Sequence, residues 1–380
     1  MSGEAAQARA PDGAAITRLR GEVRDFIRGE LGAPRLTRRV NSWAVADRDF
    51  SRALGRSGYI GMTWPRIYGG GARHPLERYV VIEELLAAGA PVGMHWIADR
   101  QSGPLLLRFG SEAQRLSILS SIARGETYTC IGMSEPGSGS DLASVRTRAV
   151  REGGGWRISG QKVWTTNAHH AQYMIALVRT DPASQRQEGL SQFLIDLASP
   201  GVTVRPIVDL TGAAEFNEVF FDDVLVPAES LVGAEGEGWR QVISELSLER
   251  SGPERYLSSL ALFLEFVRLC GAEPSQAAAQ LIGELGADLM VLRRMSLGVA
   301  TKLASGEDPA LDAAIVKDLG NSYEQHVPNA IQALADIDWS SDADFVQGLA
   351  LLLQAAPSFS LRGGTREVLR GIIARGLGLR

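Results

Sequence analysis

A carboxylate on an apolar helix face is the first feature of this 380-residue chain that could do chemistry. In ISELSLERSGPERY, residues 243–256, the helical neighbours of Glu249 are Val242, Leu246, Gly252, Pro253 and Tyr256. Burial among such residues would make a carboxylate more basic, because desolvation disfavours its charged form. The alternative is a solvated surface helix in which Arg250 pairs with Glu254, four residues further on. Spacing alone favours the surface helix.

Two glycine-rich stretches could bind an anion. SEPGSGSD, residues 134–141, follows an expected strand, and its backbone N–H groups with the hydroxyls of Ser138 and Ser140 could cradle a pyrophosphate. RGGTREVL, residues 362–369, predicts a turn and a helix capped by Thr365. Turns of this composition are common, most helix N-termini bind no anion, and no G-x-G-x-x-G fingerprint occurs. Neither stretch establishes a nucleotide site by itself.

An aromatic residue followed by hydroxyl side chains is the third candidate. In GQKVWTTN, residues 160–167, Trp164 and the threonines could stack on a planar cofactor and hydrogen-bond to it. Taken by itself, the stretch favours a β-strand with Trp164 facing the core. We expect His169 and His170, which follow it, to lie in a loop without a ligand role.

The predicted secondary structure that would position these residues changes twice along the chain, from helices to strands and back to helices. Apolar residues recur at helical spacing from Asp12, an expected N-cap, to about residue 125. Short runs rich in β-branched and aromatic residues then predict strands. Helical periodicity returns after GAEGEGW. We therefore predict an α+β fold with an N-terminal helical domain (1–125), a middle β domain (126–232) and a C-terminal helical domain (233–380).

Composition excludes several classes of protein. Hydrophobic residues at 45% and charged residues at 22% are typical of a soluble globular chain, and a net charge of −5 does not favour nucleic acid or an anionic membrane. Cys130 and Cys270 are too few for a disulfide framework and lack metal-ligand spacing. Without an apolar run of 18 residues or an apolar leader, we expect a cytoplasmic protein with no membrane insertion and no metal.

The order of these motifs resembles the acyl-CoA dehydrogenases. SEPGSGSD, WRISGQKVWTTN, FFDDVLVPAESLVGAEGEGW, LERSGP and LRGGTREVLRGIIARGLGL follow one another at matching intervals, from about residue 75 to the C-terminus. The resemblance implies the family's three-part fold, with a C-terminal four-helix domain, and FAD as cofactor. It also implies α,β-dehydrogenation of an acyl-CoA or acyl-carrier thioester, with electron-transfer flavoprotein as the electron acceptor.

The resemblance also assigns roles to single residues. Those expected to contact FAD are Ile131, Met133, Ser134, Ser140, Trp164, Thr166, Gly364, Thr365 and Glu367, with Thr166 at flavin N5. Those expected to contact the substrate are Ser140, Ser247, Arg250 and Arg375. Many members place the catalytic base directly before the Gly-Thr of the C-terminal motif, where this chain has Gly363. A minority, like isovaleryl-CoA dehydrogenase, place it in a LER context, which predicts Glu249 as the base.

The chain departs from the family pattern where the far end of FAD is bound. The Arg-x-x-Phe-Gly motif with its downstream Gln, and the Gln with a double Gly before the C-terminal signature, have no good counterpart. Either other residues, with Arg255 and Arg268 as candidates, replace them in a homo-oligomer, or a second related chain provides the contacts. We favour a homo-oligomer, a dimer or tetramer.

Two other functions are compatible with the fold that the resemblance implies. A flavin monooxygenase of the same fold would have no use for Glu249. A non-catalytic subunit that completes a partner's active site would have no need of Ser134, Thr166 and Glu249, although the degraded adenine-end motifs favour it. We therefore rank both below the dehydrogenase.

Overall fold

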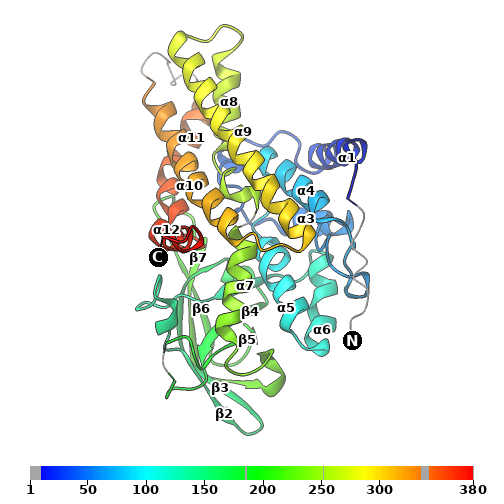
Figure 1. Cartoon of the computed structure of the whole chain (residues 1–380), viewed down its shortest axis with the longest axis vertical. Helices are drawn as coiled ribbons and strands as arrows, with labels where there is room; N and C mark the ends of the chain where they lie inside the picture. Colours follow the sequence, from blue (N-terminus) through cyan, green and yellow to red (C-terminus); the bar gives the residue numbers. More distant parts are fainter. Residues whose placement is uncertain (1–9, 185, 251, 335–341, 380) are drawn as a thin grey trace. The chain divides into compact units, whose positions relative to one another are not determined.

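The chain forms two compact units in a computed structural model that describes residues 10–184, 186–250, 252–334 and 342–379. The side chains of Ser247 and Leu248 lie outside the described part. The first unit contains Met1–Val45, Arg73–Val92 and Glu249–Arg380, and the second contains Ala46–Ala72 and Gly93–Leu248 (Figure 1). Each unit therefore combines segments that are far apart in sequence. The three domain ranges proposed from the sequence stay a prediction.

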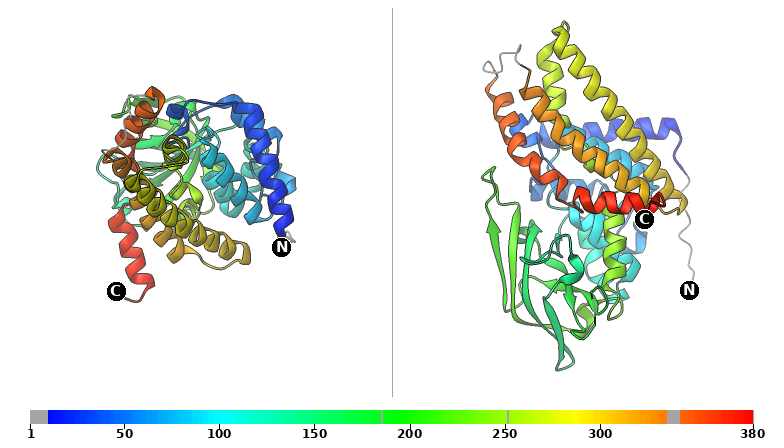
Figure 2. Two further views of the ribbon diagram at one scale, coloured as in Figure 1. Left: turned by 90° about the horizontal axis from the view of Figure 1, so that it is seen from above. Right: turned by 60° about the vertical axis from the view of Figure 1, so that its left-hand side comes forward.

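The first unit is helical. Its elements are α1 (Gly13–Leu31), α2 (Leu36–Arg39), α4 (Pro75–Ala88), η6 (Pro253–Arg255), α8 (Leu260–Cys270), α9 (Gln276–Ser305), α10 (Ala310–Gln332), α11 (Ala343–Ala355), η8 (Ala356–Ser360) and α12 (Arg366–Gly376). Helix α10 packs against α8, α9, α11 and α12, and Figure 2 shows α9 and α10 running side by side. These contacts confirm the predicted C-terminal helical domain.

Local signals explain where helices of this unit begin. The carboxylate of Asp12 accepts a hydrogen bond from the N–H of Ala15, so the predicted N-cap of α1 is confirmed. The buried face of α1 consists of Leu19, Val23 and Ile27.

In the described ranges, no helix combines the length and the apolar character that crossing a membrane requires.

The second unit is built on an eight-stranded sheet. Its strands are β1 (Thr129–Gly132), β2 (Arg148–Glu152), β3 (Gly155–Thr166), β4 (Tyr173–Arg179), β5 (Leu190–Asp196), β6 (Val202–Ile207), β7 (Phe216–Pro227) and β8 (Leu231–Val232). The order is β6–β7–β3–β2–β4–β5–β8, and β1 pairs with β4. The β1–β4 and β2–β4 pairs are parallel and the others antiparallel. The predicted middle β region is therefore confirmed.

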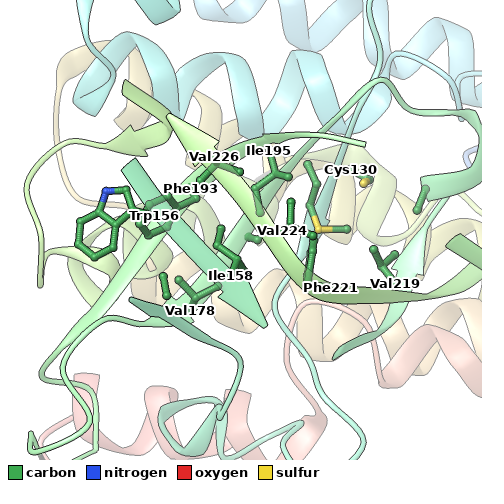
Figure 3. Close-up of a cluster of buried hydrophobic side chains, with 14 residues drawn as sticks. Cys130, Trp156, Ile158, Val178, Phe193, Ile195, Val219, Phe221, Val224 and Val226 are labelled. Carbon is green, nitrogen blue, oxygen red and sulfur yellow. The ribbon is translucent and has the colours of Figure 1, made fainter. Parts of the chain in front are cut away.

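Helices and short turns complete the second unit. They are α3 (Arg48–Arg56), η1 (Arg66–Tyr68), the π-helix η2 (Ala98–Ser102), α5 (Gly103–Phe109), α6 (Glu112–Ala123), η3 (Leu142–Ser144), η4 (Ala168–His170), η5 (Ala228–Ser230) and most of α7 (Gly238–Arg250). The sheet core contains Trp156 and Phe193, whose ring centroids lie 5.2 Å apart at 76° (Figure 3). Cys130 is buried in the same core, and both cysteines are free.

A buried ion pair ties the loop after β1 to β3. Lys162 Nζ is fully buried and lies 2.8 Å from Glu135 Oε1 and 3.1 Å from the carbonyl oxygen of Met133. Glu135 also accepts the backbone N–H groups of Arg146 (2.7 Å) and Thr147 (2.9 Å). Desolvation lowers the pKa of Lys162 to about 8, against the opposing pull of Glu135. Desolvation alone would raise the pKa of Glu135, but Lys162 and the other donors together bring it below its ordinary value.

Replacing Lys162 should therefore destabilise the second unit. Lys162→Met leaves the Glu135 carboxylate buried without its cation, and breaking a buried pair in this way costs about 3–5 kcal/mol. Urea unfolding measures the loss. Lys302→Met, which removes a partly exposed partner of Asp312, is the control and should cost no more than about 1 kcal/mol. Equal losses for the two variants would contradict a stabilising role for the buried pair.

Candidate active site

Glu249 lies in the last turn of α7, which ends at Arg250. Its side chain is 12% exposed and Arg250 is buried, so the surface-helix interpretation is wrong. The helical neighbours predicted for Glu249 beyond Arg250 are also wrong. Pro253 lacks the N–H that a continuing helix needs, and the separate 3₁₀ turn Pro253–Arg255 follows α7. Tyr256 is therefore buried elsewhere in the first unit and not on the helix face of Glu249.

A buried cation contacts the Glu249 carboxylate. Arg255 Nη2 donates to Glu249 Oε1 over 2.7 Å, and Arg255 Nε donates to the main-chain oxygen of Glu249 over 2.8 Å. The Arg255 side chain is only 3% exposed. The prediction that Arg255 reaches a neighbouring subunit's FAD is therefore wrong, because its guanidinium is buried and bonded within its own chain. Arg268 is exposed at the end of α8 and remains a candidate.

The turn before α12 brings Gly363 against Glu249. Gly363 and Gly364 have φ of +64° and +101°, a region that favours glycine. A Cβ atom at position 363 would lie 2.6 Å from Glu249 Oε1 and 3.0 Å from its Cδ. Arg250 Nε donates to the carbonyl oxygen of Gly363 over 3.0 Å, which holds the turn in place. The Glu249 carboxylate thus fills the volume that a side chain at position 363 would need.

A lysine that sequence reasoning missed completes this cluster. Lys317 of α10 is buried, its Nζ lies 3.2 Å from the carbonyl oxygen of Gly364, and its Cε would lie 3.1 Å from a Cβ at Gly363. Desolvation first, and then the charge of Arg255, lower the pKa of Lys317 to about 6 against the opposing effect of Glu249. At neutral pH the amine is therefore mostly uncharged.

The residues predicted at FAD from α12 and its turn lie in the first unit. Thr365 caps α12, with its hydroxyl oxygen accepting from the N–H of Val368 over 3.4 Å, as the sequence predicted. Glu367 lies in the first turn, where backbone N–H and the Thr365 hydroxyl lower its pKa. Arg375 lies in the last turn of the same helix. Ser247, predicted at the substrate, has a side chain outside the described part.

The residues predicted at the flavin ring from β1 and β3 lie together in the second unit. The N–H of Val163 donates to the main-chain oxygen of Ser134 over 2.9 Å, so the loop after β1 runs beside β3. Ile131 is part of β1, and Met133 packs against a small apolar cluster that includes Val242 of α7. Ser134 and the segment around Trp164 are therefore neighbours.

Trp164 does not face the core. Its side chain is 59% exposed, and its φ of +58° coincides with a register shift between β3 and β7. Such a bulge turns a side chain out of the strand's alternation, which is why the strand-based prediction for Trp164 is wrong. The ring meets Phe216 edge to face at 6.0 Å, and Thr166 lies two residues on, opposite Phe216. An exposed aromatic plate beside a hydroxyl donor fits a flavin ring.

A hollow of about 320 Å³ opens beside the small-residue loop of the second unit. Its lining includes Pro136, Gly137, Ser138, Arg146, Thr147 and Gly160, and the Lys162–Glu135 pair supports it. Ser140 is exposed in the same loop, whereas Ser138 Oγ donates to the main-chain oxygen of Asp141 over 2.7 Å. An exposed serine, glycines and an arginine can bind an anionic part of a nucleotide.

The depressed pKa of Lys317 predicts a pH-dependent stability. Between pH about 6 and its ordinary value of 10.5, the unfolded chain binds a proton at this lysine that the folded chain does not bind. Stability therefore falls as pH falls through this window. We expect the free energy of unfolding in urea to increase for Lys317→Met, relative to the wild type, as pH drops from 9 to 6. A difference between the two proteins that stays constant with pH would contradict the neutral lysine.

Comparison with known proteins places the chain in a family. Its residues 15–126 match the model "Acyl-CoA dehydrogenase, N-terminal domain", and residues 130–224 match "Acyl-CoA dehydrogenase, middle domain". It is 34% identical to acyl-CoA dehydrogenase IpdE1 of Mycobacterium tuberculosis, over 95% of this chain and 96% of that protein. It is 33% identical to FadE34 of the same organism over 86% of this chain, but spans only 45% of that protein's length.

Solved structures agree with this result. The chain is similar to the solved structure "Tcur3481-Tcur3483 steroid ACAD", with a TM-score of 0.85, 28% identity and coverage of 97% of this chain and 99% of that one. The helical and sheet regions described above match that fold. This chain belongs to the acyl-CoA dehydrogenase family of FAD-dependent oxidoreductases.

Proposed function

We propose that this dehydrogenase acts on an acyl-CoA or acyl-carrier thioester with Glu249 as the acceptor of the α-proton. The observation that supports the proposal is the shared volume of Glu249 and position 363. A base carried by residue 363 would occupy the place where the Glu249 carboxylate lies, 2.6 Å from the Cβ position. Glycine at 363 leaves that place to Glu249. The two sites are thus alternatives for one carboxylate.

The chemistry requires a carboxylate that is ionised and held close to its target. The α-proton of a thioester is weakly acidic, so a base must be positioned within hydrogen-bond reach of it. Glu249 is mostly buried and contacts Arg255, whose charge favours the ionised form. The α-proton passes to the Glu249 carboxylate, the β-hydrogen leaves as a hydride, and a double bond forms between Cα and Cβ. FAD, when bound, supplies the acceptor for that hydride.

Each unit contains residues that the family resemblance assigns to FAD. In the second unit, Ser134, Trp164 and Thr166 would meet the flavin ring, because the exposed Trp164 ring offers a stacking surface. In the first unit, Gly364 and Thr365 would contact FAD at the N-terminus of α12, where backbone N–H groups favour an anion. These contacts stay proposals, as do those of Ser140, Arg250 and Arg375 with the substrate.

We also propose a homo-oligomer, with electron-transfer flavoprotein as the electron acceptor. The chain keeps its flavin-ring residues and Glu249, which a purely supporting subunit would not need. Arg268 is exposed in the first unit and could bind phosphate oxygens through its planar fork. The opposite possibility, a related second chain, is suggested by the similar steroid ACAD structure, which carries the two names Tcur3481 and Tcur3483.

Substituting Glu249 tests the proposed base. Glu249→Gln keeps the shape but removes the proton acceptor, and losing a general base costs about 10²–10⁴ in rate. We expect the variant to bind FAD normally. The rate at which substrate reduces the bound flavin, measured anaerobically from the flavin absorbance, should fall by that factor. The substrate is chosen by screening the wild type with straight-chain, branched and steroid side-chain acyl-CoAs.

Glu22→Gln on the exposed face of α1 is the matched control for this substitution, and it should reduce its flavin at the wild-type rate. If Glu249→Gln also reduces its flavin at close to the wild-type rate with the preferred substrate, another group removes the α-proton and the assignment of Glu249 is wrong.

Expression of the chain alone tests the assembly. We expect a stable dimer or tetramer with one FAD per chain, measured by light scattering and by the ratio of flavin to protein absorbance. Arg268→Gln should weaken FAD binding if this residue reaches the far end of the cofactor. Flavin-poor protein that gains FAD only when a related chain is co-expressed would show instead that the active form is heteromeric.

A further inference from the structure

We propose that Arg255 is a positioning residue that holds the Glu249 carboxylate in the volume over Gly363 and sets the lower pH limit of its activity. The inference rests on the proposed role of Glu249 as proton acceptor. It adds a second residue of this chain, six positions further on, that holds the carboxylate in place and favours its ionised form.

The guanidinium of Arg255 donates two hydrogen bonds to Glu249. Its Nε donates to the main-chain oxygen of Glu249 and its Nη2 donates to Oε1 of the same residue, over 2.8 and 2.7 Å. One rigid planar group thus joins the main chain and the side chain of Glu249, which restricts the rotamers open to the carboxylate. A lysine ammonium has no such fork and cannot reproduce this geometry.

Arg255 is itself held in a fixed place. It ends the short turn η6, and Tyr256, the next residue, is fully buried with its hydroxyl 2.8 Å from that of Tyr79 of α4. On the other side α10 passes so closely that a Cβ on Gly320 would lie 2.1 Å from the main-chain oxygen of Arg255. The main chain that bears the guanidinium is therefore packed between two helices and has little room to shift.

Arg255 forms the described ion pair with the carboxylate, and the charge of Arg250 also acts on Glu249. The surrounding charged or titratable groups are Arg250 of α7, Glu254 of η6, Lys317 and Glu324 of α10, and Arg362 before α12. Arg250 is directed to the carbonyl oxygen of Gly363. Arg362 pairs with Glu324 at 3.2 Å and stacks on Trp43. Lys317 is mostly neutral because desolvation lowers its pKa to about 6.

The contact with Arg255 fixes the position of the Glu249 carboxylate but makes it less basic than an unpaired buried carboxylate would be. A guanidinium in contact with a carboxylate stabilises its ionised form, so Glu249 stays ready to accept a proton at lower pH than an unpaired buried carboxylate would. Removing the charge of Arg255 should therefore move the titration of Glu249 to higher pH. Removing only the fork, while keeping a charge, should leave the titration in place and disturb the position of the carboxylate.

Two variants separate these effects in the FAD-loaded enzyme with the preferred acyl-CoA. The acid limb of the kcat/KM profile, which reports groups of the free enzyme, should move up by at least about one pH unit in Arg255→Gln. In Arg255→Lys the limb should stay near its wild-type position. Flavin reduction should slow by roughly ten- to a hundredfold in both, because small misplacements of a reacting group have effects of this size.

Controls keep the result specific. Arg28→Gln changes an exposed arginine of the same unit and should leave both the limb and the rate unchanged. Repeating the profiles in a Lys317→Met background removes the titration of the neighbouring amine. FAD content and thermal unfolding of each variant show whether it is folded. If Arg255→Gln does not fold, Arg255→Lys decides the outcome, because it keeps the buried charge.

An acid limb that does not move in folded Arg255→Gln, or a wild-type rate in Arg255→Lys, overturns the proposal. Its failure is distinguishable from that of the proposed function. If Glu249→Gln is inactive while the Arg255 variants behave like the wild type, only the role of Arg255 is wrong. If Glu249→Gln keeps the wild-type rate, the proposed base is wrong and the role of Arg255 fails with it.

Discussion

The Glu249 carboxylate occupies the volume that a side chain at position 363 would need, and the candidate active site depends on glycine at this position. Glycine at 363 permits both the left-handed turn and the close approach of the carboxylate, with 2.6 Å between Oε1 and the position of an absent Cβ. A larger residue at position 363 would both strain the backbone and displace the Glu249 carboxylate. The position of the proposed base is thus determined as much by residue 363 as by Glu249.

Two neighbouring segments and two distant ones build the surroundings of that carboxylate. The end of α7 supplies Glu249, η6 supplies Arg255, and α10 supplies Lys317, while the turn before α12 provides the carbonyl oxygens that Arg250 and Lys317 meet. Burying several cations near one carboxylate is unfavourable unless their charges are offset. The neutral form of Lys317 and the pairing of other arginines with carboxylates and carbonyl oxygens reduce that penalty.

The periodicity of the sequence predicts the helices, the strands and their order, because alternation and helical spacing are local properties. It fails where one contact decides the outcome. A bulge against β7 turns Trp164 outward, and the helix end at Arg250 removes Tyr256 from the face of Glu249. The sequence does not reveal the pairing of Arg255 with Glu249, because that contact depends on the turn of η6. Lys317 left a signal in the sequence, because it shares the buried face of α10 with apolar and small residues at helical spacing.

Exchange of the α-hydrogens of 3,3-dimethylbutanoyl-CoA in D₂O tests the central claim most directly. The β-carbon of this thioester carries no hydrogen, so proton removal can be followed by mass spectrometry without any hydride transfer. With Glu249 as the proton acceptor, the FAD-loaded wild type should catalyse exchange, and Glu249→Gln should lose about 10²–10⁴ of that rate. Exchange at the wild-type rate in Glu249→Gln would contradict the account.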